Sequence, residues 1–164
     1  MTESIRFARL SYGNIGFLIN QMEILSIEPY SQANITPPSS TMPFRVYRHP
    51  LYEGIVLLPI EDLLENLTLE SISESKCILI VSFKFPEIVS ELCGDGLVDG
   101  KYIGIIWDHT FESFPMNPDG IKLFTSGIRS RLAQNGILGV SFLPQMLLYW
   151  LDLKNLISSF PGRR

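Results

Sequence analysis

The sequence predicts a mainly β fold of short antiparallel strands with a few short helices. Apolar runs of strand length recur along the 164 residues, and stretches rich in Gly, Pro, Asn and Asp separate them. This pattern is typical of strands joined by turns. A chain of this length can bury a core, so we expect a single domain over residues 1–164.

Three predicted strands follow one another closely at the start of the chain. "IRFARL" alternates apolar and polar residues over 5–10, and "YGN" predicts a turn. "IGFLI" and "MEILSIE" then continue as strands over 15–19 and 22–28. Neighbouring strands joined by tight turns usually pair with one another. We therefore expect an antiparallel meander here.

A long surface loop and a short acidic helix are predicted next. Residues 29–43 contain four prolines and three serines without periodicity, which is typical of a loop. Residues 44–67 predict one or two strands and, from Glu61, a short helix. Glu61, Asp62 and Glu65 lie near its amino end, where the helix dipole stabilises negative charge. We interpret these carboxylates as helix-stabilising rather than catalytic.

Two more strands are predicted in the middle of the chain. "KCILIVSF" is an apolar strand over 76–83, and "KYIGIIWDH" is another over 101–109. Between them, the Asp-Gly dipeptides at 95–96 and 99–100 predict turns. They do not fit the spacing of a calcium-binding loop.

The most apolar stretch, "ILGVSFLPQMLLYWLDLKNLI", covers residues 137–157. Pro144 and Gln145 interrupt it, whereas a membrane-spanning helix needs roughly 20 apolar residues. We interpret it as a hairpin of strands 137–143 and 146–151, with a buried helix as the alternative. A short terminal helix is predicted to follow, and the apolar residues expected on its inner side are Leu151, Leu153, Leu156 and Ile157.

Charge and cysteine content exclude several classes of function. The chain has 13 Lys and Arg and 17 Asp and Glu, which gives a net charge of −4. The sequence has no cluster of basic residues, so nucleic acid is not expected to be its main ligand. "MTESIRFARL" lacks the apolar core of a signal peptide, so we expect a cytoplasmic protein. Cys77 and Cys93 fit neither a redox nor a zinc motif. Two reduced thiols are expected, with a disulfide as the alternative.

Motifs of catalytic sites are missing from the sequence. It has no phosphate-binding loop, dinucleotide fingerprint, zinc-protease motif or nucleophile elbow. His49 and His109 are the only histidines, and each is isolated from an acid or a nucleophile by local spacing. Asp108 precedes His109, but adjacent residues of a strand point to opposite faces. We therefore predict no catalysis, no cofactor and no metal.

Four stretches, in this order, resemble the motifs of the CheW-like chemotaxis coupling proteins. "RFARLSYGNIGFLINQMEILSIEP" is similar to the amino-terminal strands of that family, and "HPLYEGIVLLPIEDLL" to "INLRGxVxPVxDLxxxL". "KYIGIIWDHTFESF" resembles "xxxGLLVDxVxEV", and "ILGVSFLPQMLLYWLDLKNLI" resembles the closing "IxGxxxxDxxLxLLLDLxxLL". Their order and spacing cover nearly the whole chain.

The resemblance implies two small SH3-like antiparallel β-barrels packed side by side, with a few short helices. It also implies a cytoplasmic scaffold of chemotaxis or motility signalling. Such an adaptor bridges a CheA-type histidine kinase, through the kinase's regulatory domain, to the cytoplasmic tip of a chemoreceptor or related sensor. Neither a cofactor nor insertion into the membrane is implied. The low charged content of 18% suits a surface that binds proteins.

The residues that fall on the family's partner-binding motifs are Glu23, Ile24, Ser26, Leu51, Tyr52, Glu53, Gly54, Trp107 and Asp108. Glu53 stands where the family usually has an arginine, and one extra residue separates Gly54 from Pro59. A reversed charge would repel the usual partner, so a different receptor or an altered binding mode is expected. Trp107 is either a core residue or a binding hot spot.

Two other classes of function stay open. In one, a small-molecule or enzymatic cleft lies between the two lobes, and Asp108 and His109 are its first candidates. In the other, the chain is a structural β-barrel subunit of an unrelated assembly, closed through exposed strand edges.

Overall fold

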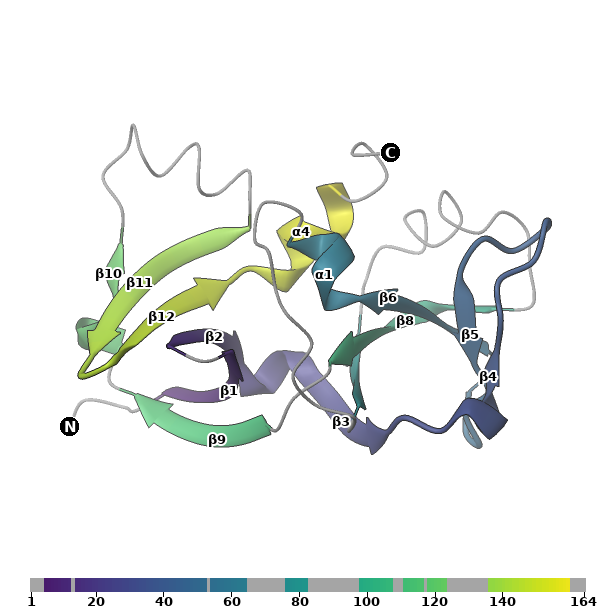
Figure 1. The fold of residues 1–164 in the computed structure, drawn as a ribbon, viewed down its shortest axis with the longest axis horizontal. Helices are drawn as coiled ribbons and strands as arrows, with labels where there is room; N and C mark the ends of the chain where they lie inside the picture. The colour runs from purple at the N-terminus through teal and green to yellow at the C-terminus, as the bar shows by residue number, and fades with distance from the viewer. Residues whose placement is uncertain are drawn as a thin grey trace.

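The computed structural model describes residues 5–12, 14–52, 54–64, 76–82, 98–107, 111–116, 118–123 and 136–159. Their strands form two six-stranded sheets that lie side by side, and we name these lobe A and lobe B (Figure 1). The two ends of the chain contribute to lobe A and its middle forms lobe B.

Lobe A has the strand order β10 (Lys122–Leu123), β11 (Ile137–Leu143), β12 (Met146–Leu151), β2 (Ile15–Asn20), β1 (Ile5–Tyr12) and β9 (Phe111–Met116). Lobe B has the order β3 (Ile24–Pro29), β7 (Cys77–Ser82), β8 (Val98–Trp107), β6 (Gly54–Pro59), β5 (Arg45–Tyr47) and β4 (Ile35–Thr36). The short helices are η1 (Gln21–Glu23), η2 (Gln32–Asn34), α1 (Ile60–Leu63), η3 (Pro118–Gly120) and α4 (Leu153–Ser159).

Each sheet curls on itself. β3 and β5 are four strands apart in lobe B, which in a flat sheet would separate them by roughly 19 Å. Yet Glu28 on β3 accepts a hydrogen bond from Tyr47 on β5. In lobe A, Ile121, which precedes β10, packs in one cluster with Phe7 on β1. The structure thus confirms the mainly β fold with two small lobes.

The apolar core has three parts. One cluster lies within lobe A, one lies within lobe B, and the third joins the two lobes. Strand alternation divides β7 between them, because Ile78 and Ile80 face the interior of lobe B while Leu79 and Val81 face lobe A. The helices α1 and α4 lie over the junction between the lobes (Figure 1). Each fully buried Leu or Ile stabilises this arrangement by about 1.5–3 kcal/mol.

The predicted amino-terminal meander is wrong. β1 and β2 pair antiparallel as expected, but β3 pairs with β7 in the other lobe. The Asn20 side chain accepts a hydrogen bond from the backbone N–H of Met22 and caps η1, where the chain leaves lobe A. The other edge of β2 is occupied by β12, which pairs with it in parallel. A strand from the far end of the chain therefore takes the place expected for β3.

Two further local predictions need correction. The stretch 29–43 is largely a loop, but it includes η2 and the short strand β4, which pairs with β5. The Asp-Gly dipeptide at 99–100 lies within β8 and makes no turn there. The dipeptide falls at an irregularity of the pairing with β6, where the paired residues pass from Val98 to Ile103 on β8 but only from Gly54 to Val56 on β6.

The carboxyl-terminal hairpin and helix are confirmed. β11 and β12 pair antiparallel, and Gln145 in their turn has a φ of 65°. In α4, Leu153, Leu156 and Ile157 are buried against the core between the lobes. Among the described helices, none has the length and apolar character needed to cross a bilayer.

Gly136 should be sensitive to substitution because it precedes β11 with a φ of +71° and lies against α4. A Cβ at this position would overlap the Leu156 side chain. We predict that Gly136→Ala lowers the free energy of unfolding by roughly 2–4 kcal/mol, from backbone strain and overpacking together. Urea denaturation measures the change. Gly120→Ala is the matched control, because Gly120 is exposed and a Cβ there meets only the end of the Met116 side chain at 3.2 Å.

Candidate functional site

A β-bulge at the start of β3 sets the direction of its side chains. Ile24 lies opposite Val81 and Ser26 lies opposite Ile80, so an extra residue, Leu25, stands between two consecutive pairs. Directly opposed residues share a face of the sheet. Ile24 therefore faces the core between the lobes, whereas Ser26 and Glu28 face the interior of lobe B.

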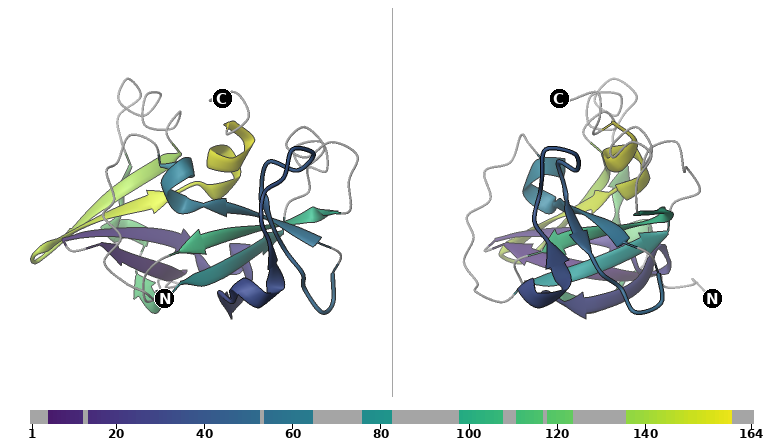
Figure 2. Two further views of the ribbon diagram at one scale, coloured as in Figure 1. Left: turned by 45° about the vertical axis from the view of Figure 1, so that its right-hand side comes forward. Right: turned by 90° about the vertical axis from the view of Figure 1, so that its right-hand side faces the viewer.

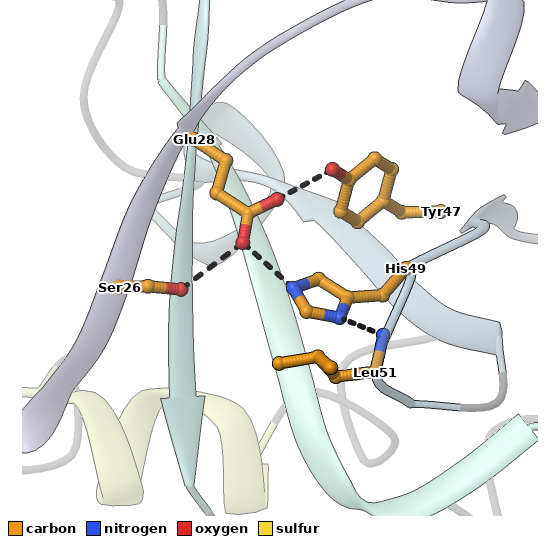
Figure 3. Close-up of polar contacts among 5 residues, drawn as sticks. All are labelled: Ser26, Glu28, Tyr47, His49 and Leu51. Atoms are coloured by element: carbon orange, nitrogen blue, oxygen red, sulfur yellow. Dashed lines mark hydrogen bonds and ion pairs between the residues drawn. The ribbon is translucent and has the colours of Figure 1, made fainter.

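Glu28 is the centre of a polar network that crosses lobe B (Figure 3). Its Oε2 accepts a hydrogen bond from the Tyr47 hydroxyl. Its Oε1 lies 2.7 Å from Nε2 of His49 and accepts a hydrogen bond of 3.3 Å from the Ser26 hydroxyl. The network joins β3 to β5 and to the turn that follows β5.

The hydrogen bonds of His49 define its tautomer. Its Nδ1 accepts a 3.0 Å hydrogen bond from the backbone N–H of Leu51, so the ring proton lies on Nε2 and is donated to Glu28. The His49 side chain is only 6% exposed. Within the described structure both ring nitrogens are engaged, and neither is left to accept a proton from a substrate. His49 thus positions the turn after β5.

The network also changes the acidity of its members. Burial by itself raises the pKa of Glu28, but hydrogen bonds from Tyr47 and His49 outweigh this effect and lower the pKa below its ordinary value. Burial and the hydrogen bond to Glu28 raise the pKa of Tyr47 to about 12. The carboxylate and the neutral phenol are therefore the stabilised forms.

Aromatic stacking extends the network to β8. The rings of His49 and Tyr52 stack with centroids 4.7 Å apart. The centroid of the Tyr52 ring lies 4.2 Å from that of Tyr102 on β8. Tyr52 is partly exposed and packs on the lobe B core. These contacts hold the turn that carries Leu51, whose side chain extends below the His49 ring (Figure 3).

The structure brings some of the predicted site residues together and separates others. Ser26, Leu51 and Tyr52 meet around the Glu28 network, although 24 residues lie between the first two in the chain. Gly54 begins β6 just after this turn. The remaining residue of the turn, Glu53, lies outside the described residues.

Glu23 and Ile24 lie at the junction of the lobes instead. Glu23 is half-buried in η1, where burial and the nearby Asp152 raise its pKa and Lys154 partly opposes them. Ile24 packs against the core shared by the lobes. The bulge therefore divides three residues that the sequence grouped together.

Trp107 is a core residue. Its side chain is fully buried and packs edge-on against Phe17 of lobe A, with ring centroids 6.1 Å apart. The sequence predicts that Trp107 is either a core residue or a binding hot spot, and its burial excludes direct contact with a partner in this conformation. Asp108 and His109 lie outside the described residues.

Large apolar side chains are exposed around the start of β3 and in the turn that follows β5. Met22 is 93% exposed, Leu25 52% and Ile27 37%, and we name these three the β3 apolar surface. β3 is the first strand in the order of its sheet, so one of its edges has no strand beside it in the described sheet. Leu51 is 80% exposed. Exposed apolar residues grouped in this way indicate a surface for binding another protein.

Sequence reasoning missed Glu28, Tyr47 and His49. Local spacing left His49 without an acid, and the fold brings Glu28 to it from 21 positions earlier in the chain. The only available signal was a glutamate within the apolar strand "ILSIEP", and the bulge concealed which way it points. Among the described residues, no group of three or more His, Cys, Asp or Glu could hold a metal ion.

Comparison with known proteins identifies the fold. No protein-family model matches the sequence, and no curated protein matches it. The structure is similar to that of the scaffolding protein TtCheW from Thermoanaerobacter tengcongensis, with a TM-score of 0.64 and 12% sequence identity. The match covers 95% of this chain and 89% of TtCheW. The chain thus has a CheW-like fold, as the four sequence motifs predicted.

The Glu28 network should make stability depend on pH. Because folding lowers the pKa of Glu28, its contribution is complete above the ordinary carboxyl pKa and is lost as pH falls through the lowered value. We predict that Glu28→Gln lowers the free energy of unfolding by about 2 kcal/mol near neutral pH. The difference in unfolding free energy between this variant and the wild type should become smaller as the pH falls. Urea denaturation at a series of pH values tests this.

Asp62→Asn is the control for the same charge change, because Asp62 is an exposed carboxylate on α1, away from the network. Its difference from the wild type should not follow the pH dependence seen for Glu28→Gln. If the unfolding free energies of Glu28→Gln and the wild type differed by the same amount at every pH, the network would not stabilise the ionised carboxylate.

Proposed function

We propose that this chain is a non-enzymatic adaptor that couples a CheA-type histidine kinase to a chemoreceptor or related sensor in chemotaxis or motility signalling. The observation that carries the proposal is the exposed β3 apolar surface on a CheW-like fold. TtCheW, whose fold is similar, is a scaffolding protein. Such an adaptor works in the cytoplasm and needs no cofactor.

The β3 apolar surface suits a protein partner for two reasons. Burial of its three side chains would stabilise a complex by roughly 25 cal/mol for each Å² of apolar area removed from water. β3 also lies at an edge of its sheet, where a strand of the partner can pair with it. Both contributions require an exposed, well-ordered strand.

The Glu28 network supports this surface from inside lobe B. Ser26 and Glu28 point inward from β3 and alternate with Leu25 and Ile27, which are exposed. A strand that is fixed before binding loses less conformational entropy in the complex. The network therefore favours binding without contacting the partner.

We propose that the partner contacts the β3 apolar surface and the turn before β6, whose residues are Leu51, Tyr52, Glu53 and Gly54. Of the other predicted residues, Ser26 supports this surface from inside lobe B, and Glu23 and Ile24 support it from the junction of the lobes. Glu53 would then present a negative charge where a CheW-like protein usually has an arginine, so the partner should offer a cation there. Asp108, the residue after the buried Trp107, lies outside the described residues, and its part in partner binding stays a prediction from the sequence.

The enzymatic alternative has less support. His49 is the one histidine among the described residues, and both of its ring nitrogens are already engaged. A structural subunit that assembles through the β3 edge would use the same exposed surface, so an experiment must distinguish it from the adaptor.

The decisive experiment is calorimetric titration of this chain with the regulatory domain of a CheA-type kinase from the same organism, followed by a receptor fragment. We expect saturable one-to-one binding. Leu25→Glu should weaken it at least about tenfold, because it places a charge in the apolar contact. Phe142→Glu, which changes another exposed apolar residue but on β11 of lobe A, should alter the affinity less than about twofold.

Absence of binding at micromolar concentrations would contradict coupling to this kinase, and equal losses in the two variants would contradict the assigned surface. Light scattering of the chain alone provides the test of the structural alternative. A mass that rises with concentration and falls in Leu25→Glu, without affinity for the kinase, would favour self-assembly.

A further inference from the structure

A pair of open pockets lies on lobe B beside the connection between β4 and β5. Figure 2 shows this connection in dark blue. The first pocket has a volume of about 380 Å³ and is lined by Tyr30, Gln32, Ile35, Pro37 and Arg45. The second, of about 240 Å³, includes Phe44 and Leu57 in its lining. Arg45 lines both and therefore stands between them.

The cation between the pockets is available for a ligand. The Arg45 side chain is exposed and makes no hydrogen bond or ion pair with any residue of the described ranges. In the first pocket Arg45 is the only charged residue of the described lining, whereas Asp62 also lines the second. A free guanidinium beside apolar walls is a good binding group for a carboxylate.

Two more cations lie next to the first pocket. The Lys76 ammonium lies 5.7 Å from the centre of the Tyr30 ring. The Arg48 guanidinium donates a 3.0 Å hydrogen bond to the carbonyl of Ala33, within η2. Arg45 thus lines the pocket, Lys76 contacts a residue of its lining, and Arg48 contacts the residue next to Gln32 of the lining, in a protein whose net charge is −4.

We propose that these pockets bind an acidic, extended peptide segment of a partner protein. A carboxylate of the segment pairs with Arg45, and the apolar side chains two residues before and two residues after it, which an extended segment presents on the same face, enter the two pockets. Tyr30 and Ile35 line the first pocket and Phe44 and Leu57 the second, so both offer apolar walls. The local positive charge selects an acidic segment over a basic one.

This site is separate from the function proposed above. It depends on Arg45 and the residues beside it, whereas the kinase titration tests the β3 apolar surface. The kinase titration can therefore contradict the adaptor proposal while the peptide site stands, and the peptide experiment can contradict the peptide site while the adaptor proposal stands. The site adds a second surface of different chemistry, because it requires a charged group as well as apolar contacts.

Fluorescence anisotropy with the full chain tests the proposal. The probe is a fluorescein-labelled peptide, Gly-Leu-Glu-Glu-Glu-Leu-Gly, in which the two leucines and the central glutamate share one face of an extended chain. We expect saturable binding that weakens as ionic strength rises, because salt screens exposed charges. Peptides in which lysine replaces each glutamate, or serine replaces each leucine, should bind at least about tenfold more weakly, since each lacks one half of the recognition.

Variants of the chain provide the matched comparison. Arg45→Glu should weaken binding of the acidic peptide at least about tenfold, and Arg45→Lys should retain part of the affinity. Arg6→Glu makes the same charge change at an exposed position on β1 of lobe A and should alter the affinity less than about twofold. Circular dichroism verifies that each variant is folded.

The proposal is overturned if the acidic peptide does not bind saturably, if the lysine peptide binds equally well, or if Arg6→Glu reduces the affinity as much as Arg45→Glu. Binding of a single-stranded oligonucleotide in preference to the acidic peptide would also overturn it, because the site would then recognise phosphates rather than a peptide carboxylate.

Discussion

Closure of lobe B depends on the contact between the Glu28 carboxylate and its two partners, Tyr47 and His49. Partial burial of this carboxylate is unfavourable by itself, and the hydrogen bonds from Tyr47 and His49 offset that cost. The partners lie on and just after β5, which the sheet order places four strands from β3. The sheet must therefore curl for the carboxylate to be satisfied, and the curled sheet encloses the lobe B core.

The same contact connects stability with the surface that a partner would meet. His49 uses its second nitrogen to hold the backbone of Leu51, and its ring supports Tyr52. On β3, the inward Ser26 and Glu28 alternate with the exposed Leu25 and Ile27. A change in the network would thus alter the turn and the strand together. This coupling explains how a small lobe can present exposed apolar residues on an ordered strand.

About half of the candidate site could be predicted from the sequence. The resemblance to CheW-like proteins identified Ser26, Leu51 and Tyr52, which the structure gathers around one network. It could not identify the carboxylate at the centre, because Tyr47 and His49 lie 19 and 21 positions beyond Glu28 and no local spacing connects them. The alternation of β3 was also misleading, since the bulge moves Ile24 and Ser26 to opposite faces.

The sequence by itself determined the local elements, including the apolar strand β7, the hairpin of β11 and β12, and the apolar side of α4. These follow from the period of apolar residues and from turn residues, which act over a few positions. Only the tertiary structure decided that β12 pairs in parallel with β2 and that β3 joins the other lobe. Strand pairing depends on which edges and apolar faces meet across the whole core, and this information is not contained in any single segment.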